Sequence, residues 1–156
     1  MTVITNNNSD IYEKHIKDSC NYNTDTDNKQ KQFLRFSFKA ITTKYNKDGI
    51  EKKVPIGMPN WRSISKTTLH PHHQAQAIIC GKPSNITVFD FDDREEYDKL
   101  LQLHPALQHC YRVQTKKGYH LYFHYHPSIL TTTDAMFHYK GVDIRNDNSI
   151  VFCPPT

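Results

Sequence analysis

The chain has 156 residues, close to the size of one domain, which excludes a multidomain assembly on this chain. Its apolar content of 37% is below the globular average, yet an aromatic content of 12% is too high for a wholly disordered polymer. Twenty basic against sixteen acidic residues give a net charge of +4, which favours a polyanionic partner without demonstrating one. We expect one folded core and a segment that does not pack.

No apolar run approaches the roughly 18–20 residues that span a bilayer, and the first residues lack the pattern of a signal peptide. We therefore predict a soluble, intracellular protein with no membrane partner. The cysteines are scattered along the chain without a Cys-x-x-Cys pair. In that compartment we expect all four to be reduced thiols that mostly fill the core: Cys20, Cys80, Cys110 and Cys153.

The first 31 residues are dominated by Asn, Asp, Thr and Lys, a composition that cannot offset the entropy of ordering. This predicts a largely disordered tail over 1–31 and a folded core over 32–156. The core opens with an aromatic and β-branched run at 33–41. Turn chemistry at 46–49 and a second short run ending at Val54 then predict a β-hairpin.

Two strands are predicted at 76–80 and 85–92, and a helix follows them. Asp93 is placed to cap this helix, Glu96 completes a capping box, and Pro105 ends it. Four further runs read as strands. Strands interleaved with one well-defined helix indicate an α+β sheet domain. The four further strands are expected at 110–115, 119–125, 142–145 and 150–153.

An acidic pair ends the strand at 85–92. Strand alternation puts Asp90 and Asp92 on one face, whereas Phe89 and Phe91 point to the core. The two carboxylates repel each other unless a cation lies between them, and hard divalent ions prefer such oxygen ligands. The pair therefore suits a magnesium clamp. Acidic residues at a strand end are, however, more commonly solvated turn or capping residues.

A basic turn precedes the strand at 119–125. Gly118 lies beside Lys116 and Lys117, so backbone N–H groups and ammonium charges could approach an anion such as a triphosphate. His120 then enters the strand and points to one face. The alternative is a solvated Lys-Lys turn with a histidine that only donates a hydrogen bond.

A third cluster lies on the strand at 142–145. Asp143 and Arg145 share a strand face, which would fit a metal ligand beside a phosphate-binding fork or an ordinary salt bridge. The three clusters follow in order on three separate predicted strands. This order favours one shared functional site.

Taken together, residues 88–92 (VFDFD), 118–120 (GYH) and 142–143 (VD) resemble the three motifs of archaeo-eukaryotic primases. The flanking runs at 54–61, 115–123 and 143–156 resemble the bifunctional DNA primase/polymerase (Prim-Pol) domain that precedes the helicase in large DNA viruses. The resemblance covers roughly 33–156. It implies an archaeo-eukaryotic primase-like core, built from an α/β module and an RRM-like sheet. Since family domains usually continue further, it also implies truncation at the C-terminus.

The resemblance implies template-directed transfer of nucleotides from nucleoside triphosphates, which starts or extends a primer on single-stranded DNA. By position, Asp90, Asp92 and Asp143 would be catalytic residues that hold two Mg²⁺ or Mn²⁺ ions. One ion would activate the attacking 3′-hydroxyl, and the other would neutralise the triphosphate as pyrophosphate leaves.

Other residues would bind the nucleotide under the same resemblance. His120 would be catalytic and contact the incoming phosphates, with Lys116, Lys117 and Arg145 as further nucleotide-binding candidates. Trp61 is either a base-stacking platform or a core residue. A replicative helicase on the same or a separate chain would be a partner, and the host cytoplasm or a viral replication site would be the location.

Two other functions fit parts of the sequence. A catalytically incomplete Prim-Pol paralogue would bind single-stranded DNA or a replication partner through its basic and aromatic residues. A rolling-circle nicking endonuclease of the His-hydrophobic-His (HUH) type would bind a metal through His124 and His126 and attack DNA with Tyr139. The second alternative leaves the three aspartates without a role.

Overall fold

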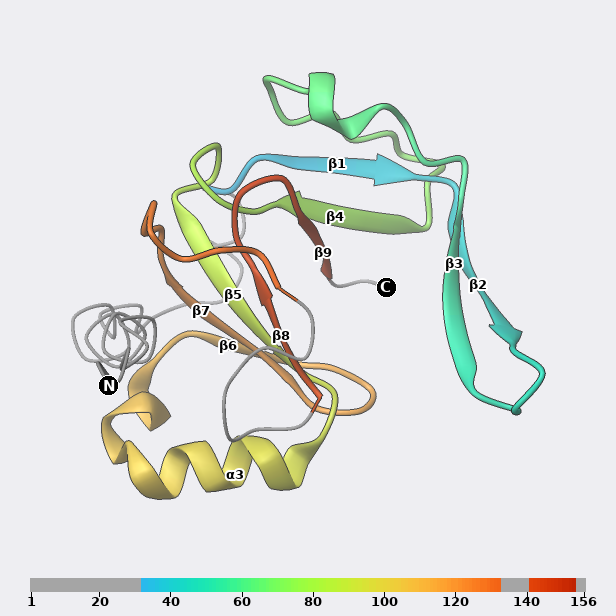
Figure 1. The fold of residues 1–156 in the computed structure, drawn as a ribbon. Helices are drawn as coiled ribbons and strands as arrows, with labels where there is room; N and C mark the ends of the chain where they lie inside the picture. Colours follow the sequence, from blue (N-terminus) through green and yellow to red (C-terminus); the bar gives the residue numbers. More distant parts are fainter. Residues whose placement is uncertain (1–31, 133–140, 154–156) are drawn as a thin grey trace, which may run out of the picture.

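The structure is a computed structural model that describes residues 32–132 and 141–153. The predicted tail at 1–31, Cys20 and Tyr139 lie outside the described residues. Within the described ranges, nine strands form three sheets, with one α-helix and two short 3-10 turns (Figure 1). No helix in these ranges is both long and apolar enough to cross a bilayer.

The elements follow one another along the chain with short connections. The strands are β1 (Arg35–Phe38), β2 (Ala40–Tyr45), β3 (Glu51–Ile56), β4 (Ala75–Ile79), β5 (Ile86–Phe91), β6 (Arg112–Gln114), β7 (Tyr119–His124), β8 (Val142–Arg145) and β9 (Ile150–Cys153). The helix is α3 (Arg94–Leu103), and the 3-10 turns are η1 (Trp61–Ser63) and η2 (Pro105–His109).

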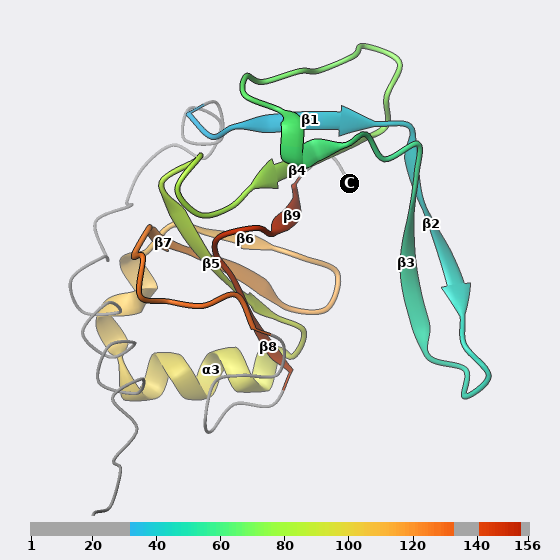
Figure 2. The ribbon, with the colours of Figure 1, turned by 45° about the horizontal axis from the view of Figure 1, so that its top comes forward.

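The largest sheet is antiparallel and has the strand order β6-β7-β5-β8. A second antiparallel sheet, β1-β4-β9, lies against part of one face of it, and the hairpin β2–β3 extends away from the second sheet (Figures 1 and 2). Mixed helix and antiparallel sheet confirm the predicted α+β class. The division into an α/β module and an RRM-like sheet stays a prediction.

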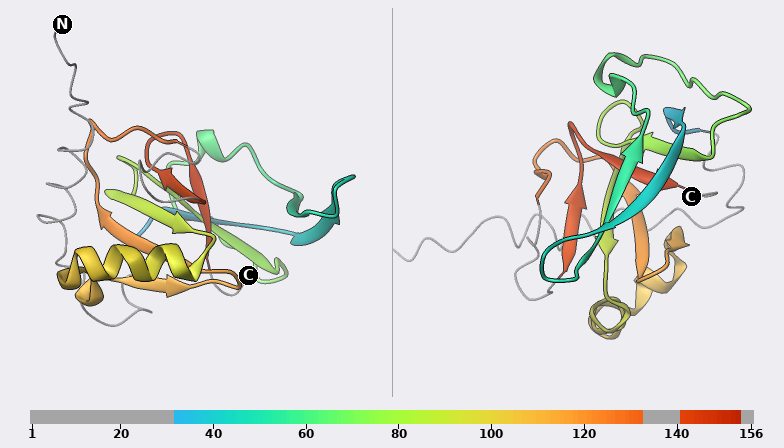
Figure 3. Two further views of the ribbon diagram at one scale, coloured as in Figure 1. Left: turned by 60° about the horizontal axis from the view of Figure 1, so that its bottom comes forward. Right: turned by 90° about the vertical axis from the view of Figure 1, so that its right-hand side faces the viewer.

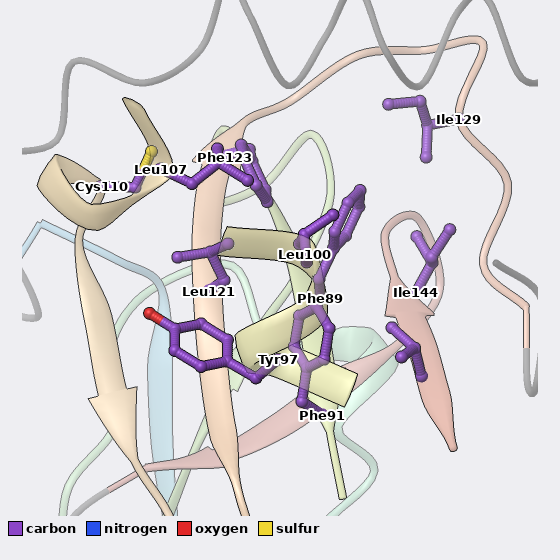
Figure 4. Close-up of a cluster of buried hydrophobic side chains, with 11 residues drawn as sticks. Phe89, Phe91, Tyr97, Leu100, Leu107, Cys110, Leu121, Phe123, Ile129 and Ile144 are labelled. Carbon is purple, nitrogen blue, oxygen red and sulfur yellow. The ribbon is translucent and has the colours of Figure 1, made fainter. Parts of the chain in front are cut away.

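The central strand β5 is buried on both faces over most of its length. Phe89 and Phe91 face a cluster that includes Tyr97 and Leu100 of α3, and all four side chains are almost inaccessible to solvent (Figure 4). Each fully buried side chain of this size contributes about 1.5–3 kcal/mol through removal of apolar surface from water. This packing fixes the face from which Asp90 projects, since alternate residues of a strand point oppositely.

The second sheet covers only part of the opposite face. Ile86 and Val88 of β5 pack with Ile78 and Val151 of the second sheet, and the cover ends before Asp90. On the outer face of the second sheet, Trp61 packs against a third buried cluster. The guanidinium of Arg62 also lies 4.3 Å from the centre of the Trp61 ring. These contacts favour the core role of Trp61 over the base-stacking role.

Most predicted elements are confirmed, but the run at 33–41 is not one strand of a hairpin. Its first part, β1, pairs with β4, and only the part from Ala40 onward pairs with β3. The physical reason is burial, because β1 needs cover on both faces, whereas β2 becomes exposed toward its end. The sheet partner of a strand depends on such long-range packing.

At the N-terminus of α3, the predicted N-cap is present but the predicted capping box is not. Asp93 accepts a hydrogen bond of 2.8 Å from the backbone N–H of Glu95, so the N-cap is confirmed. Glu96 does not complete the expected capping box. Its carboxylate lies 2.7 Å from the ammonium of Lys99, one turn further along the helix.

The expectation for the cysteines is corrected at one position. Cys80 and Cys153 are free and buried, and burial raises the pKa of Cys80 to about 12 and that of Cys153 to about 11. Both therefore stay protonated core residues at neutral pH. Cys110, in contrast, is disulfide-bonded. Sequence spacing could not reveal this, because a disulfide requires proximity in space rather than along the chain.

Candidate active site

The centre of the site is a row of three residues on three adjacent strands. Asp90 of β5 pairs directly with His120 of β7 on one side and with Asp143 of β8 on the other. Directly paired residues of antiparallel strands project from the same face, with Cβ atoms about 4.5–5.5 Å apart. The register therefore brings together three side chains that are up to 53 positions apart in the chain, Asp90 to Asp143.

His120 holds Asp90 in its charged form. Its Nε2 lies 3.2 Å from Oδ1 of Asp90. Burial by itself raises the pKa of Asp90, but the hydrogen bond and charge of His120, with the charges of Arg145 and Lys53, outweigh it and lower the pKa. Among the described residues, the Nδ1 of His120 is buried without a hydrogen-bond partner, so the imidazole is oriented toward Asp90 through Nε2.

Asp92 lies one residue beyond β5, where its backbone N–H donates a hydrogen bond of 3.1 Å to the carbonyl of Gly141. This bond ties the end of β5 to the start of β8. Partial burial raises the pKa of Asp92, and the negative charges of Asp90 and Asp143 raise it further. The three carboxylates therefore repel one another across a single face of the sheet.

Asp90, Asp92 and His120 face a cleft of about 660 Å³, whose lining does not include Asp143. Arg145 lies in the cleft lining and pairs with Asp143 at 2.7 Å from Nη2 to Oδ2. The turn between β6 and β7 and the hairpin β2–β3 both line the cleft. The hairpin lies in front of the large sheet in the right-hand view of Figure 3. The cleft thus has an acidic floor and basic sides. Of the predicted site residues, it is lined by Asp90, Asp92, Lys116, Lys117, His120 and Arg145.

An acidic row on adjacent strands beside a basic turn is the arrangement that the sequence motifs predict. The family model for the N-terminal domain of bifunctional DNA primase/polymerase (Prim-Pol) matches residues 42–156. The chain belongs to the Prim-Pol family. No curated protein and no solved structure gives a significant match. The Prim-Pol assignment indicates, in general terms, a DNA primase/polymerase of DNA replication with DNA and nucleotides as its partners.

The hairpin wall of this Prim-Pol site was missed by sequence reasoning. Thr43, Glu51 and Lys53 line the cleft, and the charge of Lys53 helps to lower the pKa of Asp90. In the sequence these residues read as an ordinary solvated hairpin. Strand alternation predicts that these residues share one face of the hairpin. It does not predict that this face lies against the acidic row of the large sheet.

Gly118 has a different role from the one that the sequence suggests. Its N–H is already donated to Oγ1 of Thr115 at 3.0 Å, within the turn. A Cβ at Gly118 would overlap the carbonyl oxygen of Phe91, in the strand that carries Asp90. The glycine therefore permits the turn to pack against the end of β5, and the lysines of the turn carry its positive charge.

The aspartates suit a divalent cation because of their oxygen donors, although they do not form a preformed coordination site in the described residues. Within residues 32–132 and 141–153, no group of three or more His, Cys, Asp or Glu side chains is arranged closely enough to hold a metal ion. Three carboxylates on one face are nevertheless hard oxygen donors, and their repulsion, seen in the raised pKa of Asp92, is what a bound cation would relieve. The metal assignment stays a prediction.

The histidines of the nicking-endonuclease alternative lie at the other end of the large sheet. His124 pairs with Ile86, at the start of β5, whereas the acidic row lies near its end. Nδ1 of His126 accepts a hydrogen bond of 3.1 Å from the backbone N–H of Ser128. In the described part of the chain, the two histidines do not belong to a metal-binding group. The nicking-endonuclease alternative stays a prediction, since its nucleophile Tyr139 lies outside the described residues.

Proposed function

We propose that this Prim-Pol domain transfers nucleotides from nucleoside triphosphates to a growing primer on a single-stranded DNA template, with Mg²⁺ or Mn²⁺ as cofactor. The observation that carries the proposal is the register that places Asp90 between His120 and Asp143 at the floor of a basic cleft. A viral role and a helicase partner rest on the motif resemblance alone and stay predictions.

Asp90, Asp92 and Asp143 would hold the divalent ions, which supply activation of the attacking hydroxyl and neutralisation of the triphosphate. The chain itself prepares these ligands. His120 keeps Asp90 ionised, because loss of its hydrogen bond would let burial raise the pKa of that carboxyl. Arg145 orients Asp143 through their 2.7 Å contact.

The basic residues of the cleft would bind and orient the polyphosphate. Lys117 and Arg145 flank the acidic row from the β6–β7 turn and from β8, respectively. Their charges would offset those of the phosphates, and the planar guanidinium of Arg145 suits a bidentate contact. His120 faces Asp90 in this structure, so its direct contact with phosphate is proposed for the nucleotide-bound protein only.

The test supplies the full chain with a single-stranded template, labelled ribo- or deoxynucleoside triphosphates and Mg²⁺ or Mn²⁺, and measures the short products. We expect Asp90→Asn and Asp143→Asn to lower synthesis at least about 1,000-fold, since stabilisation of transition-state charge by a metal is worth several kcal/mol. Asp98→Asn, on the exposed face of α3, is the matched control and should leave synthesis unchanged.

Circular dichroism of each variant should show an unchanged fold, so that a loss of product reports on chemistry. Synthesis that persists in Asp90→Asn and Asp143→Asn would contradict the metal assignment. Binding of the template without any product under all conditions would instead assign the chain to the binding-only class of Prim-Pol paralogue.

A further inference from the structure

The hairpin β2–β3 presents one face to the cleft. Its register pairs Thr43 with Lys53 and Tyr45 with Glu51. Since paired residues share a face and alternate residues return to it, Ile41, Thr43, Glu51 and Lys53 all project the same way. All four line the cleft. The hairpin that carries them lies in front of the large sheet (Figure 3, right).

Lys53 is the cation of this face. Its side chain is exposed, and it makes no ion pair or hydrogen bond with any residue of the described ranges. It lines the same cleft as Asp90, Asp92 and His120. An ammonium group thus faces the acidic floor across open cleft space, where an anion could lie between them.

Lys116 is engaged elsewhere. Its Nζ lies 3.5 Å from Oε1 of Glu51, and within residues 32–132 and 141–153 this is the ion pair that joins the hairpin to the large sheet. The pair connects the two walls of the cleft. The ammonium that the sequence suggests for phosphate binding thus already has an acidic partner on the hairpin, whereas Lys53 makes no ion pair with a described residue.

We propose that the hairpin is a phosphate-binding arm, in which Lys53 contacts the triphosphate of the incoming nucleotide and the Glu51–Lys116 ion pair holds the arm in place. This inference rests on the proposed function and adds a binding residue and a positioning pair to it. Lys116 acts through Glu51 rather than as a phosphate ligand.

The charge pattern of the arm favours a compact anion over an extended nucleic-acid backbone. On the cleft face, Lys53 is followed toward the hairpin tip by Glu51, and Tyr45 is paired opposite it. The hairpin contributes two lysines to the cleft lining, Lys52 and Lys53, and the acidic Glu51 beyond them would not track a chain of phosphates. Three cations from three different elements converge instead around the aspartates: Lys53, Lys117 and Arg145.

The binding test uses the full chain, Mg²⁺, and ATP and dATP that carry a fluorophore on the sugar. We expect Lys53→Gln to weaken binding of the triphosphate about tenfold, equivalent to about 1.4 kcal/mol. Inorganic triphosphate should displace the probe from Lys53→Gln less efficiently than from wild type. The control is Lys44→Gln, which makes the same charge change on the opposite face of the hairpin and should bind normally.

Equal binding by Lys53→Gln and wild type would overturn the arm proposal while leaving the proposed function standing. An equal loss in Lys44→Gln would also overturn it, because the effect would then be one of net charge. Failure of the proposed function is recognised separately, by synthesis that persists in Asp90→Asn and Asp143→Asn.

The positioning pair is tested by exchanging its charges. Lys116→Glu places two acids together, so we expect the KM for the triphosphate to rise about tenfold with little change in kcat. The double variant Glu51→Lys with Lys116→Glu should restore KM to within about twofold. A double variant as impaired as Lys116→Glu alone would overturn the positioning role.

Discussion

The central strands of the large sheet and the β2–β3 hairpin form opposite sides of one cleft but differ in how they are held. In β5 nearly every side chain is buried, and Asp90 is the partly exposed exception. In the hairpin the side chains become exposed toward the tip, with Tyr45 68% and Ile50 61% accessible. Rigid packing thus supports the acidic row, whereas the hairpin carries charge on an element with little core of its own.

The difference suggests a division of labour. A strand that is packed on both faces holds its side chains in a precise geometry, and β5 holds Asp90 in this way. A slip of its register by one residue would turn Asp90 into the core, so the pairing is strongly specified. A phosphate-binding wall needs only charge at roughly the right distance, which an exposed hairpin can supply.

The largest expected contrast is one of stability between the two regions. Phe89→Ala should lower the free energy of unfolding by about 3–5 kcal/mol, because it leaves a cavity in the main cluster. Tyr45→Ala on the hairpin should change it by no more than about 0.5 kcal/mol. Urea unfolding of both variants measures the contrast, and similar losses in the two would break the comparison.

Two glycines give a second, smaller contrast. Gly118→Ala should destabilise the fold by about 1–3 kcal/mol, because the new methyl group overlaps the backbone of Phe91. Gly49 in the hairpin turn has open space around its Cα but a φ of +73°. Gly49→Ala should cost only about 1 kcal/mol of left-handed backbone strain. A cost at Gly118 below that at Gly49 would contradict the close packing described.

Removal of the donor to Asp90 should change the pH dependence of stability. The folded-state pKa of Asp90 is lowered, so its stabilising contribution is present above about pH 4 and is lost as pH falls through the folded value. His120→Leu should therefore lower stability at pH 7 by about 1 kcal/mol and flatten the acid limb. Urea midpoints measured between pH 7 and pH 2 test this, and an unchanged acid limb would count against the contact.

Asp92 should show the opposite sign. Its folded-state pKa is raised, so its ionisation destabilises the fold as pH rises through that value. Asp92→Asn should raise the stability of the metal-free protein by up to about 0.5 kcal/mol. The increase in Tm on adding MgCl₂ or MnCl₂ should become smaller in this variant. An equal increase in variant and wild type would remove Asp92 from the proposed ligand set.

Sequence patterns were informative wherever a local rule sets the outcome. The alternation of Phe89 and Asp90, the Asp93 cap and the strand boundaries near the three motifs follow from nearest-neighbour geometry, and the structure confirms them. Sequence patterns did not predict strand partners and packing contacts that depend on segments distant in the chain. The division of residues 33–41 between two sheets and the packing role of Gly118 both depend on residues far away in the chain.

The sequence by itself determined the three motifs, their order and the face that each acidic side chain takes, because period-two alternation is a property of any strand. Only the tertiary structure decided that Asp90 lies between His120 and Asp143 and that Lys53 faces them from the hairpin. Strand order and register minimise exposed apolar surface over the whole core. A local sequence pattern does not contain this information, because the buried apolar surface depends on contacts between all of the strands.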